Sequence, residues 1–111
     1  MMKTLAEFKC VACRGDTSPL SAGEIADLLP EVPAWELIED EGIQRLERVF
    51  PFRDFSEGLE FANRVGTIAE SEEHHPKMTV EWGRVTIQWW TYAIGGLHMN
   101  DFVMAAKTDQ L

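Results

Sequence analysis

Residues 78–89 constrain the fold most, because apolar residues alternate there on both sides of a glycine. The alternating residues are Met78, Val80, Trp82, Val85, Ile87 and Trp89. Side chains of a strand point to opposite faces in turn, so an antiparallel hairpin would place all of them on one face. The predicted turn is Gly83-Arg84, with glycine at the first central position, as a type II′ turn requires. That turn sets Trp82 opposite Val85, and the other pairs follow at two-residue steps.

A second hairpin is predicted upstream, with strands over residues 35–38 and 43–50. The polar link 39–42 ends in glycine and suits a hairpin connection. In the second strand Leu46 points to one face and Arg45 to the other. This alternation indicates a sheet with one covered face and one face in water.

A long helix is predicted from about Phe55 to about Glu72. Asp54 and Glu57 have the spacing of a capping box at its start. Its apolar residues recur at helical spacing and are Phe55, Leu59, Ala62, Val65 and Ala69. The helix should end before Pro76, because the residue preceding a proline disfavours the helical backbone.

Two shorter helices complete the pattern. Ser21 and Glu24 mark the start of one that stops by Pro30, and Gly95-Gly96 precedes another through Phe102. The order α-β-β-α-β-β-α predicts an α+β domain, with a four-stranded antiparallel sheet and helices packed on one face. We expect this single domain over residues 21–111, after an irregular N-terminal lead-in over residues 1–20.

Charge and hydropathy exclude several classes of protein. The net charge is −9 and no basic stripe is present, so nucleic acid is not an expected partner. No apolar run reaches the length of a membrane span, and the N-terminus lacks the apolar block of a signal peptide. A cytoplasmic protein without a membrane partner is therefore expected.

Cys10 and Cys13 form the one Cys-x-x-Cys of the sequence. A structural zinc site takes four ligands, and no second pair completes one. A redox pair would be expected to follow a strand in a βαβ unit, which the pattern lacks. We therefore interpret both as reduced cysteines and expect no metal, with a zinc ion shared between subunits as the alternative.

His74 and His75 lie together at the end of the long helix and carry the candidate chemistry. Glu70 precedes His74 by four residues, which predicts a shared helix face over the last turn. Histidine titrates near neutral pH and suits general acid or base catalysis. Taken alone, such a pair is more typical of a C-terminal helix cap than of a catalytic site.

Extending the hairpin register adds a geometric prediction, because it sets His75 opposite Tyr92. Trp90 then lies on the same face as Tyr92, away from the core. Such a polar and aromatic concavity suits a flat, hydrogen-bonding heterocycle better than a metal or a phosphate. Trp90 is alternatively an exposed residue or a subunit contact.

The motif around these residues has a recognisable spacing: Glu70, then His74-His75-Pro76, Trp82, Tyr92 and Asp101. Further matching segments are Lys9-Cys10 with Cys13, Pro19-Leu20, Phe52-Arg53-Asp54-Phe55, Asn63-Arg64-Val65, Trp82-Gly83-Arg84-Val85-Thr86, Gly95-Gly96-Leu97, Asn100-Asp101-Phe102 and Ala105-Ala106-Lys107. Over nearly its whole length the sequence resembles the pterin-4a-carbinolamine dehydratases.

The resemblance implies dehydration of 4a-hydroxytetrahydropterin to quinonoid dihydropterin in tetrahydrobiopterin recycling, without a cofactor. His74 and His75 would share the acid and base roles, and Glu70 would orient them. The implied catalytic residues are His74, His75, Glu70, Tyr92 and Asp101, and the implied substrate-binding residues are Glu73, Pro76, Trp90 and Thr91. It also implies a homodimer or homotetramer, and an aromatic amino-acid hydroxylase in the same pathway.

Two positions depart from the family pattern. Tyr92 stands where the family has a third histidine, and a phenol with an ordinary pKa of about 10 is a poor proton carrier at neutral pH. Reduced activity is therefore expected. His98 stands where the family has a capping threonine, and it either reaches into the site or lies at the surface.

A second class of function fits the same resemblance, namely a non-catalytic binding or assembly module built on this fold. The acidic composition suits contacts with proteins. Retention of the histidine pair with Glu70 and Asp101 favours the enzyme.

Overall fold

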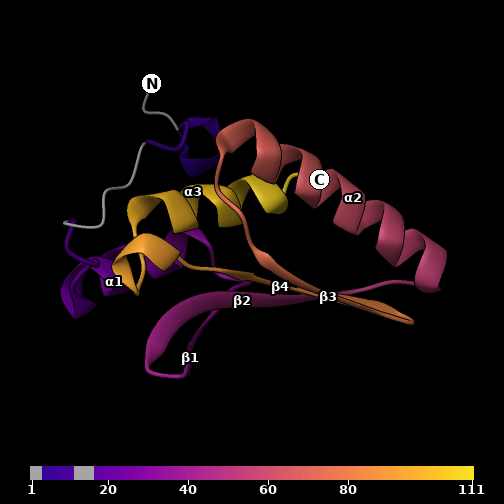
Figure 1. Cartoon of the computed structure of the whole chain (residues 1–111), viewed down its shortest axis with the longest axis horizontal. Helices are drawn as coiled ribbons and strands as arrows, with labels where there is room; N and C mark the ends of the chain where they lie inside the picture. The colour runs from indigo at the N-terminus through magenta and orange to yellow at the C-terminus, as the bar shows by residue number, and fades with distance from the viewer. Residues whose placement is uncertain (1–3, 12–16) are drawn as a thin grey trace.

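Four antiparallel strands form one sheet, and helices α2 and α3 cover the same face of it (Figure 1). The computed structural model describes residues 4–11 and 17–111. The strands are β1 (Glu36–Asp40), β2 (Ile43–Pro51), β3 (Lys77–Glu81) and β4 (Arg84–Trp89), and the helices are α1 (Ala22–Leu28), α2 (Phe55–Glu72) and α3 (Met99–Thr108). Their order in the sheet is β1-β2-β4-β3. The predicted α+β class and element order are confirmed. Among the described residues, no helix is long and apolar enough to cross a membrane.

Helix α2 has the predicted bounds, and three of its five predicted apolar residues, Ala62, Val65 and Ala69, are buried. Asp54 caps it by accepting a hydrogen bond from the Glu57 N–H at 2.9 Å. The buried residues are Gly58, Phe61, Ala62, Val65 and Ala69. Phe55 and Leu59, predicted to be buried, are each 44% exposed. Glycine at position 58 favours the observed buried face, because it allows α2 to lie close to β4. A Cβ on Gly58 would lie 3.2 Å from Cγ2 of Val85.

The turn of the β3–β4 hairpin differs from the predicted one. It is Trp82-Gly83, so that Glu81 pairs with Arg84. Gly83 has φ +84° at the second central position, as in a type II turn, whereas the prediction placed it first. The shift moves Trp82 out of the core face, and its side chain is 75% exposed.

The β1–β2 hairpin is also tighter than predicted. Asp40 pairs with Ile43, which leaves the two-residue turn Glu41-Gly42. Both turn residues have positive φ, +53° and +78°, as a type I′ turn requires. Both strands therefore run to the turn without the four-residue link that the sequence indicated.

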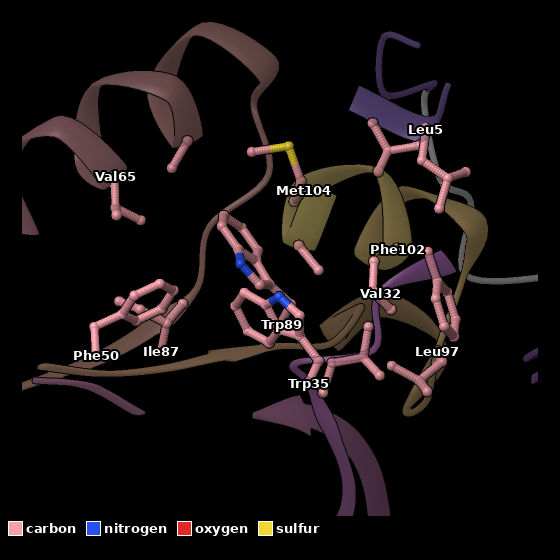
Figure 2. Packing of buried hydrophobic residues seen from close by; sticks show 14 of the residues in the cluster. Leu5, Val32, Trp35, Phe50, Val65, Ile87, Trp89, Leu97, Phe102 and Met104 are labelled. Carbon is pink, nitrogen blue, oxygen red and sulfur yellow. The ribbon is translucent and has the colours of Figure 1, made fainter. Parts of the chain in front are cut away.

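The core lies between the sheet and the two longer helices, with Trp89 near its centre (Figure 2). Trp89 is fully buried, and its indole N–H donates to Oγ1 of Thr108 at 3.2 Å. The first 20 residues, predicted to be irregular, contain a 3-10 turn, η1 (Leu5–Glu7). Leu5 is 6% exposed and joins the same core.

The sequence indicated that the face of the sheet away from the helices lies in water, but part of this face is buried. Arg45 on that face is 6% exposed. Its guanidinium carbon lies 3.9 Å from the centre of the Trp90 ring, and Nη1 donates to Gln88 at 3.2 Å. A cation over an indole face is an attractive arrangement that explains how this charge is held away from water.

The two hairpin tryptophans provide a test of the register. We expect Trp89→Ala to lower the free energy of unfolding by about 3–5 kcal/mol, because it empties a large core site. Trp82→Ala, which removes the same indole from an exposed turn, should change it by less than about 0.5 kcal/mol. Urea unfolding of both variants measures this difference. A large loss for Trp82→Ala would contradict the observed turn.

Candidate active site

A left-handed residue at the end of α2 places the first histidine. Glu73 has φ +53° and ψ +38°. The His74 N–H donates to the Ala69 carbonyl at 3.1 Å and the Glu73 N–H to the Glu70 carbonyl at 3.3 Å, which is a Schellman motif. The chain thus leaves the helix before His74. The prediction that Glu70 and His74 share a helix face is therefore wrong.

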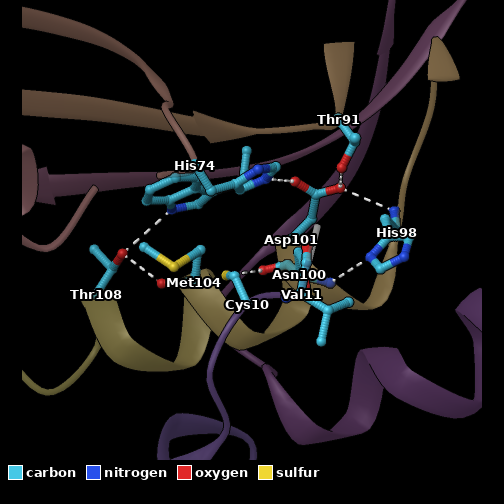
Figure 3. Close-up of polar contacts among 10 residues, drawn as sticks. Cys10, Val11, His74, Thr91, His98, Asn100, Asp101, Met104 and Thr108 are labelled. Carbon is cyan, nitrogen blue, oxygen red and sulfur yellow. Dashed lines mark hydrogen bonds and ion pairs between the residues drawn. The ribbon is translucent and has the colours of Figure 1, made fainter. Parts of the chain in front are cut away.

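His74 is held by a buried carboxylate instead. Its Nε2 lies 2.6 Å from Oδ1 of Asp101, and its ring stacks on Trp89 with centroids 5.7 Å apart and planes at 9° (Figure 3). Asp101 is fully buried, and its Oδ2 accepts from the Thr91 hydroxyl at 2.8 Å and the His98 N–H at 2.9 Å. These donors satisfy the carboxylate, as a buried charge requires.

The network also assigns the tautomer of His74. Because Asp101 accepts from its other partners, Nε2 of His74 carries the hydrogen and donates to Oδ1. Nδ1 has no hydrogen-bond partner among residues 4–11 and 17–111. A neutral His74 therefore has a lone pair available on Nδ1, as a general base requires.

His75 forms a second histidine–carboxylate pair, with Glu70 as its partner. Its Nε2 lies 2.5 Å from Oε1 of Glu70. The two side chains are 61% and 79% exposed, so this pair is much weaker than a buried one. Glu70 thus orients His75, whereas Asp101 orients His74.

A pocket of about 360 Å³ opens beside the two histidines. Its lining residues are Cys10, Val11, Glu72, Glu73, His74, His75, Trp90, Thr91, Tyr92, Ala93 and Asn100. Six of these were predicted at the site. The predicted residues Glu70, Pro76 and Asp101 do not line it, although Glu70 and Asp101 contact the histidines that do. No pattern in the sequence predicted the other lining residues, which are Cys10, Val11, Glu72, Ala93 and Asn100.

Tyr92 lies at the rim of the pocket and is 87% exposed. The predicted ladder between His75 and Tyr92 does not form, because β4 ends at Trp89 and β3 begins at Lys77. Tyr92 instead begins the 3-10 turn η3 (Tyr92–Ile94). Trp90 is half-buried, and its indole N–H has no hydrogen-bond partner among the described residues.

His98 neither reaches into the site nor lies fully exposed at the surface, the two positions that the sequence analysis considered. Its Nδ1 accepts from the Asn100 N–H at 3.0 Å, and its own N–H donates to Asp101. The imidazole thus caps α3 in a reciprocal capping box, as a threonine would. His98 is half-buried and does not line the pocket, so it does not replace the third histidine.

Cys10 lines the pocket and is half-buried, and its thiol donates to the backbone carbonyl of Asn100 at 3.9 Å. Burial, reinforced by the nearby charges of Glu72 and Asp101, raises its pKa to about 12. Cys13, the other half of the predicted cysteine pair, lies outside the described residues. Within the described ranges, no three His, Cys, Asp or Glu side chains are grouped so as to hold a metal ion.

The fold and the site together define a small α+β protein with a carboxylate-oriented histidine pair beside an open pocket. Residues 18–111 match the family described as "Pterin 4 alpha carbinolamine dehydratase". The chain belongs to this family.

Similar proteins cover nearly the whole chain. A protein of Gloeobacter violaceus is 56% identical over 96% of this chain and 92% of its own length, and one of Chlorobium luteolum is 51% identical over 99% and 96%. Both carry the name "Putative pterin-4-alpha-carbinolamine dehydratase", the first with the number 1. A crystal structure described as a transcriptional coactivator/pterin dehydratase from Brucella melitensis superposes with a TM-score of 0.75 at 27% identity, over 84% of this chain and 97% of that one.

The left-handed backbone at Glu73 yields a stability prediction. A residue with a Cβ is disfavoured there by about 1–2 kcal/mol, while glycine gains unfolded-state freedom of about 0.4–1 kcal/mol. We therefore expect Glu73→Gly to raise the free energy of unfolding by about 0.5–1 kcal/mol, as measured by urea denaturation. Glu73→Ala, which keeps the Cβ, should change it little. Equal stabilisation by both variants would point to the lost charge and contradict the backbone explanation.

Proposed function

We propose that this protein dehydrates 4a-hydroxytetrahydropterin to quinonoid dihydropterin in tetrahydrobiopterin recycling. The observation that carries the proposal is the buried His74–Asp101 pair, which leaves Nδ1 of His74 unpartnered at a pocket in a member of this family. An oriented imidazole beside a pocket is the arrangement that general acid–base catalysis needs.

The reaction moves two protons and needs one acid and one base. The C4a–O bond breaks with its electron pair on oxygen, and a proton from the acid releases water. A base removes a proton from a ring nitrogen, and the freed electron pair forms the C=N bond of the quinonoid product. We assign the base to His74, because the Asp101 carboxylate stabilises the imidazolium that forms. We assign the acid to His75, which is exposed and can regain its proton from water.

The walls of the pocket suit a pterin. The pyrimidine edge of a pterin presents an amino group and a ring N–H, and the exposed Glu73 carboxylate is an acceptor for such donors. Trp90 offers an aromatic surface, and Arg45 fixes that ring from the other side. In this proposal Thr91 acts through Asp101, while Pro76 directs the chain from the site into β3.

Dehydration of freshly generated 4a-hydroxytetrahydropterin tests the proposal. We expect His74→Ala to lower kcat by about 10²–10⁴-fold, the usual contribution of one general acid or base. Tyr92→His should raise kcat, because it restores an imidazole at the rim of the pocket. His98→Asn removes a histidine but keeps a good helix cap, so it serves as the matched control and should stay within about twofold.

The outcome also separates the two classes of function. Activity in the parent that disappears in His74→Ala supports a dehydratase with a weakened site. A parent rate equal to the uncatalysed rate, with activity only in Tyr92→His, would overturn the enzymatic proposal and favour a binding or assembly module.

We further propose that the protein is a cytoplasmic homodimer or homotetramer, working beside an aromatic amino-acid hydroxylase. Support for self-association comes from α2, where the exposed Phe55 and Leu59 lie one turn apart. Exposed apolar side chains that form a patch often mark protein contacts.

Light scattering tests this assembly. The parent should have the mass of two or four chains, and Leu59→Glu should lower the mass because a charge disfavours an apolar contact. Arg64→Glu, a charge change elsewhere on the exposed surface of α2, is the control and should leave the mass unchanged. A monomeric parent would contradict the proposal.

A further inference from the structure

We infer that residues 4–11, the N-terminal strap, form a substrate-binding wall of the pocket, and that Asn100 and Glu72 are the positioning residues that hold it. This inference rests on the proposed function, since it concerns pterin binding at the same site. The strap precedes residues 18–111, over which the chain matches the family description, although the similar protein of Chlorobium luteolum matches 99% of the chain. None of the strap residues carries a proton-transfer role in the proposed reaction.

The strap is fixed at both ends against α3. At its start Leu5 is buried in the core, and Nζ of Lys107, near the end of α3, donates to the Ala6 carbonyl at 2.8 Å. At its other end the Asn100 side chain binds the backbone of Val11 twice, accepting from its N–H at 3.0 Å and donating to its carbonyl at 2.7 Å. The strap therefore follows α3 from its last turn to its first (Figures 1 and 3).

A third contact ties the strap to the helix that ends at the histidines. Oε1 of Glu72, the last residue of α2, accepts from the Cys10 N–H at 2.8 Å. Glu72 precedes His74 by two residues, and Asn100 directly precedes Asp101. Glu72 and Asn100 are thus close in sequence to His74 and Asp101, which form the buried histidine–carboxylate pair. The strap has a fixed position relative to that pair as a result.

The pocket needs the strap for its shape. Three chain segments line it: residues 72–75 after α2, residues 90–93 after β4, and Cys10 with Val11 of the strap, with Asn100 completing the lining. Release of the strap would leave two walls and a shallower site. A flat ring would then lose contact surface, whereas the His74–Asp101 hydrogen bond would be unchanged. Binding should weaken without loss of the chemical step.

The first experiment removes the two hydrogen bonds between the Asn100 side chain and the backbone of Val11. We expect Asn100→Ala to raise the Kd for biopterin, measured by calorimetry, by about tenfold, equivalent to about 1.4 kcal/mol. KM for the 4a-hydroxy substrate should rise similarly while kcat stays within about threefold, because uniform binding is lost. Asn63→Ala, at an exposed position of α2, is the matched control and should bind as the parent does.

The second experiment separates the hydrogen bond of Glu72 from its charge. Glu72→Ala should also raise the Kd for biopterin about tenfold. Glu72→Gln keeps an oxygen that can accept from the Cys10 N–H, so its Kd should stay within about twofold of the parent. Glu60→Ala on the exposed side of α2 is the control. Equal weakening in Glu72→Gln and Glu72→Ala would overturn the positioning role of Glu72.

A third measurement follows the strap without any pterin. The Cys10 thiol donates to the backbone carbonyl of Asn100, which Asn100→Ala retains, and its partly buried position holds its pKa at about 12. In a Cys13→Ser background, Asn100→Ala should make alkylation by iodoacetamide at pH 8 at least about tenfold faster, because the thiolate fraction rises when the thiol is released.

These readouts keep the two proposals apart. Faster alkylation in Asn100→Ala with an unchanged Kd for biopterin would overturn the proposal that the strap forms a substrate-binding wall. It would leave the dehydratase proposal intact. A parent that neither binds biopterin nor dehydrates the substrate would overturn the proposed function, and with it the role of the strap in pterin binding. Unchanged alkylation in Asn100→Ala would show that Asn100 does not hold the strap.

Discussion

The buried carboxylate of Asp101 is the interaction on which the rest of the site depends. It accepts hydrogen bonds from His74 after α2, from Thr91 after β4 and from the backbone of His98 before α3. An unpaired charge at a fully buried position would be costly, so each donor stabilises the others' placement. Asp101 therefore holds together three chain segments, two of which line the pocket.

Local patterns predicted the elements well but not their contacts. Helix α2 was placed correctly because Asp54 caps its start and Pro76 prevents its continuation. The β3–β4 turn was misplaced because the positive φ of a glycine serves either central position, the first in type II′ or the second in type II. The two registers differ by two residues, which preserves the faces of β4 but not the burial of Trp82. The buried face of α2 was predicted only in part, because close approach at Gly58 leaves Phe55 and Leu59 exposed.

The site could be predicted only where it rests on side chains of a distinctive type. The spacing of the histidine pair and Asp101 predicted that they belong to the site. Glu70 was wrongly assigned to His74, because the helix ends at a left-handed residue that is a glutamate, whereas glycine or asparagine usually marks such an end. The position of Val11 in the pocket could not be predicted from the sequence, because Asn100 binds the backbone of Val11 and nearly every residue has the same backbone groups. A contact across 89 residues that ignores side-chain identity has no local signature.

Two neighbouring residues of the chain, Trp89 and Trp90, support the pocket from opposite sides of the sheet. Trp89 lies in the core beneath the ring of His74, and Trp90 lines the pocket above the guanidinium of Arg45. Adjacent positions of an extended chain alternate in direction, so deleting or inserting one residue in β4 would exchange the surroundings of the two indoles. A change in the length of the segment from Arg84 to Trp90 should therefore disturb both indoles at once, whereas a substitution disturbs a single position. In this segment of the protein, residue count is itself a functional constraint.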